Sequence, residues 1–213
     1  MNFTAMSALI IFIFCAADVL PRAFKKAGFG KWKAGYFALC VWVMRIFEIK
    51  FLPEFTLNIS VIIIFVCCAL LETFTEEKKV LKTLPVIIFC SALSAFYNMT
   101  AEENETGLLL ISLLTALLGL VSGGLISAFA CSAAVPVFSA IIKFIAELCI
   151  YNYGTLEFTG NTVDAQMTGL VFAAVLYEIY MAVKNHIGKK KILTAKNEPA
   201  KKNTGGMKTG KAE

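Results

Sequence analysis

An uncharged run of 36 residues, Gly107 to Ile142, constrains this chain more than any other feature of its sequence. As one helix it would be about 54 Å long at 1.5 Å per residue, whereas the hydrocarbon core of a bilayer is about 30 Å thick. The run must therefore turn back on itself. We predict the turn at residues 131–135, with Pro136 in the first turn of the next helix. The alternative is Ser122-Gly123-Gly124.

The rest of the chain is also too apolar for a soluble protein. Its residues are 58% hydrophobic and only 16% charged, against about 45–50% and 25% in soluble domains. Apolar runs of roughly spanning length alternate with short polar segments. We therefore predict an all-α fold, a polytopic transmembrane helix bundle with about seven spans. The predicted spans are residues 3–20, 34–50, 55–72, 81–99, 107–129, 134–152 and 166–183.

Basic residues occur in alternate loops, which indicates the orientation. Of the 20 Lys and Arg residues, 17 lie in residues 22–33, in residues 78–82 or after the last span. Because cytoplasmic loops are rich in Lys and Arg, we predict the N-terminus outside and the C-terminus inside, in the plasma membrane of a bacterium. A single crossing between residues 107 and 152 would put the basic end outside, which is a second reason to expect a hairpin.

Residues 184–213 differ from the rest of the chain. They contain nine lysines and two glutamates, with few apolar residues, and this composition predicts a disordered cytoplasmic tail. The tail would either attract anionic lipid head groups, by about 1 kcal/mol per basic residue, or serve only as a topology signal. Nucleic-acid binding is not expected, because no aromatic platform accompanies the lysines.

Three charged residues within the predicted spans are the main functional candidates, because a charge at the bilayer centre costs at least about 2.5–3.5 kcal/mol. Lys143 and Glu147 are four residues apart, on one face of a helix, where they can pair. Glu178 is predicted at a similar depth on the neighbouring helix. The three residues would form a polar cluster. Such a cluster is either a relay or ion-coordinating site, or a structural ion pair that fixes the helix register.

Other charged residues lie near span ends. Asp164 is predicted to cap the N-terminus of the last helix. Asp18 lies at the end of the first span, at helical spacing from Arg22. Arg45 and Glu48 have the same relation at the end of the second span, and both pairs are predicted to lie at the membrane interface.

Small residues form a stripe on the fifth span, which would let helix backbones approach closely. We interpret the stripe as packing within the bundle, with a homodimer contact or the wall of a narrow pathway as alternatives. Its members are Ser112, Ala116, Gly119, Gly123 and Ser127.

Catalytic and metal chemistry are not expected. The seven cysteines all lie in apolar runs without a CxxC pair, and His186 is the single histidine. The sequence has no phosphate-binding glycine loop. We therefore predict no enzyme activity, no cofactor and no metal site.

Two resemblances follow from short motifs. The Gly160-x-x-x-Asp164 segment, the small and apolar run after it and Glu178 resemble the C-terminal signature of a bacterial and archaeal domain-of-unknown-function family of multispanning membrane proteins. The segment Leu57-Asn58-Ile59-Ser60 fits the same pattern, and the similarity covers most of residues 5–183. This resemblance implies a membrane bundle and carries no activity with it.

The second resemblance is to the membrane sensor part of GHKL-type histidine kinases. It depends on Pro136-x-x-Ser139 and on Tyr177-Glu178-x-Tyr180. Since only 27 residues follow His186, it implies a detached receptor-like module without a kinase.

The leading functional hypothesis is permeation of a small solute or an ion through the bundle, with Lys143, Glu147 and Glu178 as its polar elements. The alternative is a non-catalytic membrane sensor or assembly partner, acting as a homo-oligomer or with another membrane protein.

Overall fold

The computed structural model describes residues 3–28, 30–75, 80–100 and 105–197. In these ranges the chain is mainly helical, with three short strands. Residues 1–178 form one unit and residues 179–213 a second. The elements are α1 (Phe3–Ala17), α2 (Pro21–Lys26), α3 (Lys31–Met44), β1 (Glu48–Leu52), β2 (Phe55–Asn58), α4 (Ile59–Thr75), α5 (Val80–Thr100), α6 (Glu105–Gly123), α7 (Leu125–Tyr151), β3 (Leu156–Phe158) and α8 (Gly160–Asn197).

Four helices within the described ranges are long and apolar enough to cross a membrane. Their apolar segments are residues 81–100, 106–123, 125–151 and 160–187. Three further apolar helices, in α1, α3 and α4, are shorter. The prediction of a helical chain with membrane-spanning helices is confirmed to this extent.

The uncharged run does form a helical hairpin, but the preferred position of its turn was wrong. α6 ends at Gly123 and α7 begins at Leu125, so the turn is at the alternative site. Gly124 has φ 96° and ψ −162°, a backbone conformation that is essentially restricted to glycine. Residues 131–135 remain helical, and Pro136 lies inside α7, as membrane helices tolerate. The predicted spans at 107–129 and 134–152 are therefore corrected to α6 and α7, whose bounds differ from the prediction.

A small sheet modifies the all-α prediction. β1 pairs antiparallel with β2, and β2 pairs parallel with β3. β2 and the first three residues of β1 come from residues that the sequence assigned to the ends of spans 34–50 and 55–72. Aromatic and β-branched residues suit strands, and only Pro53 and Glu54 separate the two strands. α3 is therefore shorter than predicted, ending at Met44.

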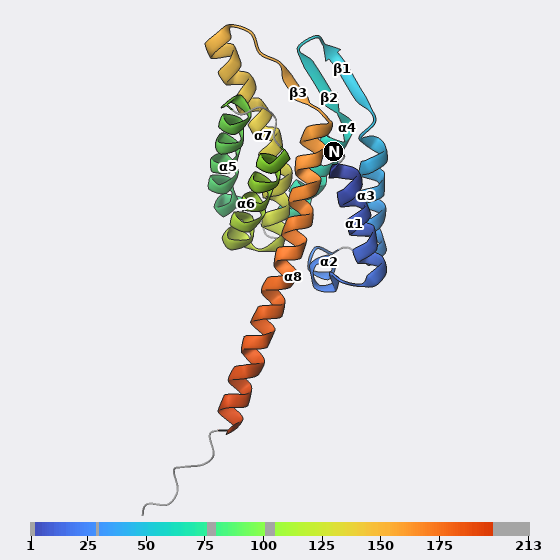
Figure 1. Cartoon of the computed structure of the whole chain (residues 1–213), viewed down its shortest axis with the longest axis vertical. Coiled ribbons are helices and arrows are strands. Elements are labelled where there is room, and N and C mark those ends of the chain that lie inside the picture. Colours follow the sequence, from blue (N-terminus) through green and yellow to red (C-terminus); the bar gives the residue numbers. More distant parts are fainter. Residues whose placement is uncertain (1–2, 29, 76–79, 101–104, 198–213) are drawn as a thin grey trace, which may run out of the picture. The chain divides into compact units, whose positions relative to one another are not determined.

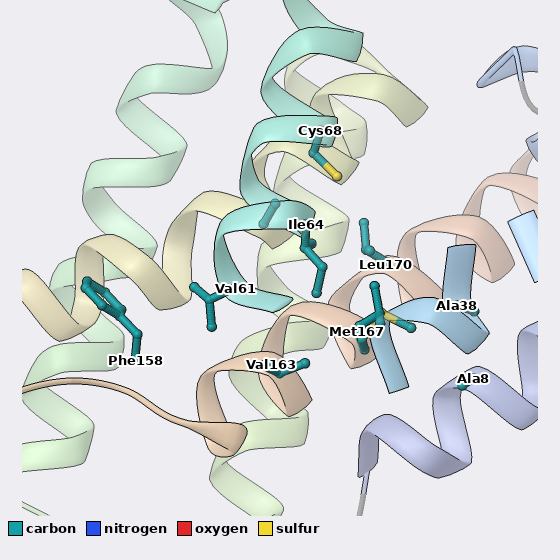
Figure 2. Close-up of a cluster of buried hydrophobic side chains, with 11 residues drawn as sticks. Ala8, Ala38, Val61, Ile64, Cys68, Phe158, Val163, Met167 and Leu170 are labelled. Atoms are coloured by element: carbon teal, nitrogen blue, oxygen red, sulfur yellow. The ribbon is translucent and has the colours of Figure 1, made fainter. Parts of the chain in front are cut away.

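The helices of residues 1–178 pack as two groups with α8 between them. α5, α6 and α7 contact one another, as α1 and α3 do, and α4 contacts α7 (Figure 1). Val163 and Met167 of α8 lie in one buried cluster with Val61 and Ile64 of α4 (Figure 2). A second cluster joins Ala173 of α8 to Ala116 of α6 and Ala128 of α7. Polar residues of α8 are thereby brought inside the bundle.

The second unit continues α8 to Asn197. The sequence assigned residues 184–197 to a disordered tail, whereas the structure has them helical. Lysine is a good helix former, and the next proline is Pro199. Lys184 lies over the ring of Tyr180, with 5.9 Å between its Nζ atom and the ring centroid. Residues 198–213 of the predicted tail lie outside the described residues.

Candidate functional site

A polar cavity of about 380 Å³ lies among α5, α6, α7 and α8. Its volume is within the range of small-molecule sites, roughly 300–1,000 Å³. Thr155 and Glu157, in and just before β3, line one end, and Ser132 and Gly169 line the other. Most of its polar wall is hydroxyl groups. Those on the helices are Ser94, Tyr97, Ser112, Thr115, Ser132, Ser139 and Thr162.

The hydroxyl groups of the cavity differ in what they bind. Ser139 donates to the Ser94 hydroxyl at 3.0 Å, and Ser112 donates to the Ala165 carbonyl at 3.4 Å. Ser132 is 2% exposed, and its hydroxyl has no hydrogen-bond partner among the described residues. Buried polar groups nearly always have a partner, and this hydroxyl lacks one that a molecule in the cavity could supply.

Lys143 lines the cavity and pairs with Glu147, as the sequence predicted. Its Nζ atom is 3.7 Å from the nearer carboxylate oxygen of Glu147. The other oxygen of Glu147 accepts a hydrogen bond from the Thr155 backbone N–H at 3.3 Å. The side chains are 39% and 20% exposed, so the pair lies at the edge of the bundle, and its contribution to stability is small.

Glu178 lies far from that pair, so the structure does not assemble the predicted cluster of three. Ser132 of α7 and Gly169 of α8 are in contact, which sets the two helices level at this point. Lys143 is 11 residues further along α7, and Glu178 is nine residues further along the antiparallel α8. At 1.5 Å per residue the two charges are about 30 Å apart along the bundle. The prediction failed because it placed the α6–α7 turn too late.

Glu178 instead caps the short helix α2. Its Oε1 atom accepts hydrogen bonds from the backbone N–H groups of Arg22 at 2.7 Å and Ala23 at 2.8 Å. The residue at the N-cap position of α2, Leu20, makes no side-chain cap. The first N–H groups of a helix need an acceptor, and Glu178 supplies it from a segment more than 150 residues away.

Replacing Glu178 with alanine is expected to lower the free energy of unfolding by about 1–3 kcal/mol, because two N–H groups lose their acceptor. Glu178→Gln keeps an acceptor oxygen and should lose clearly less. Thermal unfolding of the purified protein in detergent measures both. Equal losses in the two variants would show that the charge, and not the cap, is what matters.

Asp164 is buried and does not cap α8. The helix begins four residues earlier, at Gly160, and has no acidic residue in its first turn. The carboxylate, 3% exposed for the whole residue, binds the Arg45 side chain through two hydrogen bonds of 3.1 Å and 2.9 Å. It also accepts from the backbone N–H and the hydroxyl of Thr4. Asp164 thus joins α1, the end of α3 and α8.

Arg45 is the centre of this network, which includes both motifs of the first resemblance. Asn58 donates to the Arg45 carbonyl at 2.7 Å, and its side-chain oxygen accepts from the Ser60 N–H at 3.0 Å. The predicted Arg45–Glu48 pairing is replaced, because Arg45 binds Asp164 and Glu48 accepts from the Gly160 N–H at 3.0 Å. In the sequence, Asn58 and Asp164 are recognisable as polar residues beside apolar runs. Nothing in the sequence identified Arg45 as their common partner.

Asp18 ends α1, as predicted, in the left-handed conformation with φ 54°. The Val19 N–H then donates to the Phe14 carbonyl at 3.0 Å, which closes the helix end. The predicted partner of Asp18, Arg22, has its backbone N–H bound by Glu178.

In the described part of the chain, no three His, Cys, Asp or Glu side chains are placed to hold a metal ion. Comparisons of the chain with protein-family models, with curated proteins and with solved structures gave no match. The proposals for the function are therefore based on the cavity and on the Arg45–Asp164 network.

Proposed function

We propose that the chain is a multi-pass protein of the cytoplasmic membrane with seven spans, its N-terminus outside and its C-terminus inside. The four long apolar helices and the three shorter ones support this count. With seven crossings, residues 22–33, residues 78–82 and the residues after 183 lie on one side. These segments hold most of the basic residues, in agreement with the positive-inside rule.

Exposed apolar residues just before and within β1 support a crossing by α3. This helix has 14 residues, about 21 Å at 1.5 Å per residue, which is short for a bilayer. The residues that follow it expose large apolar side chains, which extend the apolar surface into the membrane interface. They are Ile46, Phe47, Ile49, Phe51 and Leu52.

Single cysteines in a cysteine-free background test this topology. Glu157→Cys is expected to react with a membrane-impermeant maleimide added to intact cells, whereas Ala195→Cys should react only after the cells are opened. Labelling of both positions from the same side would show that α8 does not cross the membrane, and would contradict the count of seven.

For the activity, we propose that a small polar solute or an ion crosses the membrane through the cavity. The cavity itself is the observation that carries this proposal. From Lys143 to Ser132 it extends over 11 residues of α7, about 16 Å. Beyond Ser132 an apolar cluster that includes Ala116, Ala128 and Ala173 fills the bundle. A solute would therefore enter from the side of β3, and its passage requires the helices around this cluster to separate.

A phenyl ring in the cavity tests this function. Ala165 lines the cavity, so Ala165→Phe is expected to reduce solute or ion flux into reconstituted vesicles to the level of protein-free vesicles. Ala92 is exposed on α5, and Ala92→Phe is the matched control that should keep the flux of the parent. No flux in the parent, or equal flux in both variants, would remove the proposal.

A second candidate is a non-catalytic sensor or assembly partner, and a specific observation favours it. Asp164 and Glu178 both bind segments far away in the chain, so these charges have structural partners. Under this proposal a membrane or cytoplasmic protein copurifies with the chain, and Ala165→Phe does not affect the copurification.

A further inference from the structure

We infer that the solute of the cavity is a small, uncharged polyol; this inference rests on the proposed permeation function and narrows it. The cavity is large enough for a small molecule. Its chemistry is a wall of neutral hydroxyl groups beside aliphatic surface. The chemistry of this wall decides which solutes can leave water and enter the cavity.

The described lining residues include three charged side chains, of which two are neutralised by partners outside the lining and the third, Glu157, is exposed. They are Lys143, Glu157 and Asp164. Asp164 is neutralised by Arg45 at 2.9 Å and already accepts from Thr4. Lys143 has Glu147 at 3.7 Å. Moving an unpaired ion out of water costs far more than moving a hydroxyl group, and none of the described residues at the inner end of the cavity carries an opposite charge to offset that cost.

The inner end of the cavity is instead suited to a hydroxyl group. Ser132 and Thr115 line it from α7 and α6, and a hydroxyl group both donates and accepts. The hydroxyl of Ser132 is buried without a partner in the described part of the protein. A solute hydroxyl would satisfy it in either role, whereas an anion or a cation would satisfy only one.

The aliphatic part of the wall completes the match. Ile111, Val135 and Pro136 line the same cavity, so its wall holds hydrocarbon as well as hydroxyl groups. A polyol likewise carries C–H groups on the carbons that bear its hydroxyls. The solute can therefore bury its carbon chain against these side chains while its hydroxyls bond to the serines and threonines.

Re-swelling of vesicles tests the inference. Vesicles containing the full-length protein are mixed with excess glycerol, erythritol, glycine or potassium chloride, and the rate of re-swelling is followed by light scattering. We expect both polyols to enter faster than in protein-free vesicles, and glycine and potassium chloride to enter at the protein-free rate. Ser132→Ala should slow polyol entry by about two- to tenfold, the effect of one hydrogen bond to an uncharged group.

The chain offers a matched control for this substitution. Ser127 also lies on α7, is 0% exposed and has an unpartnered hydroxyl among the described residues, but it is outside the cavity lining. Ser127→Ala should therefore leave polyol entry unchanged. Thr115→Val removes a second cavity hydroxyl and should slow entry as Ser132→Ala does, which covers the case in which one variant does not fold.

The outcomes distinguish failure of the polyol inference from failure of the permeation proposal. Entry of glycine or potassium chloride in place of polyols would overturn the inference and leave permeation standing. Equal effects of Ser132→Ala and Ser127→Ala would overturn the assignment of the polyol to this cavity. Protein-free rates for every solute, with folded protein in the vesicles, would overturn both permeation and the polyol.

Discussion

Replacing Asp164 with leucine is expected to lower the free energy of unfolding by about 3–5 kcal/mol, the usual effect of removing one partner of a buried ion pair. The substitution leaves the Arg45 guanidinium, which Asp164 binds through two hydrogen bonds, without its acceptor. It also removes the acceptor of the Thr4 N–H. For a chain of this length the loss corresponds to a fall of roughly 6–20 °C in the unfolding temperature. Tryptophan fluorescence during heating in detergent measures it.

Two further variants separate the charge from the shape of this site. Asp164→Asn keeps an acceptor oxygen for Thr4 and should lose less stability than Asp164→Leu. Arg45→Leu combined with Asp164→Leu removes both charges and should be more stable than either single variant, because no buried charge is left unpaired. Glu157→Gln, at an exposed carboxylate near the cavity, is the control and should not change the unfolding temperature. An Asp164→Leu protein as stable as the parent would contradict the structural role of the network.

Local patterns in the sequence were sufficient to predict several features of the fold. The length of the uncharged run required a hairpin, because no bilayer accommodates a single helix of that length. The spacing of Lys143 and Glu147 predicted their pairing, since it depends on helix geometry alone. The apolar runs predicted helices wherever α1 and α4–α8 lie, although not their bounds.

The position of the hairpin turn was not decided by local signals. Pro136 and Gly124 are both typical of helix boundaries, and only the structure shows that Gly124 adopts a positive φ while Pro136 stays within α7. The error moved Lys143 and Glu178 to the same depth. A shift of about ten residues in one turn was therefore enough to predict a cluster that does not form.

Contacts between distant segments could not be read from the sequence at all. Arg45 and Asp164 are 119 residues apart, and Glu178 is 156 residues from Arg22. The sequence offered Arg45 a neighbour at helical spacing, Glu48, but the structure gives it the distant partner Asp164. The short strands were also missed: residues 48–51 alternate polar and apolar side chains, which is a strand pattern, but most of the residues of the two strands were assigned to the ends of the neighbouring spans.

Replacing Gly119 with leucine is expected to disrupt the α6–α7 hairpin, with a loss of at least about 3 kcal/mol in the free energy of unfolding. A Cβ atom at Gly119 would lie 2.6 Å from the Cα atom of Ala128, and a backbone atom cannot move aside as a side chain does. Gly119 of the small-residue stripe thus packs against α7 within the same chain, and Ser127, which was predicted on the same span, lies on α7 itself. Because Ser132 is one helical turn beyond Ala128, separation of the two helices would also displace the inner end of the cavity. Gly119→Leu should therefore lose polyol entry together with stability.

A pair of alanine variants gives the sharpest form of this prediction. At Gly35, in the middle of α3, a Cβ atom would meet its nearest neighbour, a ring carbon of Phe12, at 3.5 Å, an ordinary contact. Gly35→Ala is expected to keep or raise the unfolding temperature, because alanine favours a helix by about 1 kcal/mol over glycine. Gly119→Ala gains the same helix propensity but must push α7 away, so its unfolding temperature should fall. If the two variants shift in the same direction, the close approach of α6 and α7 is not what glycine at position 119 provides.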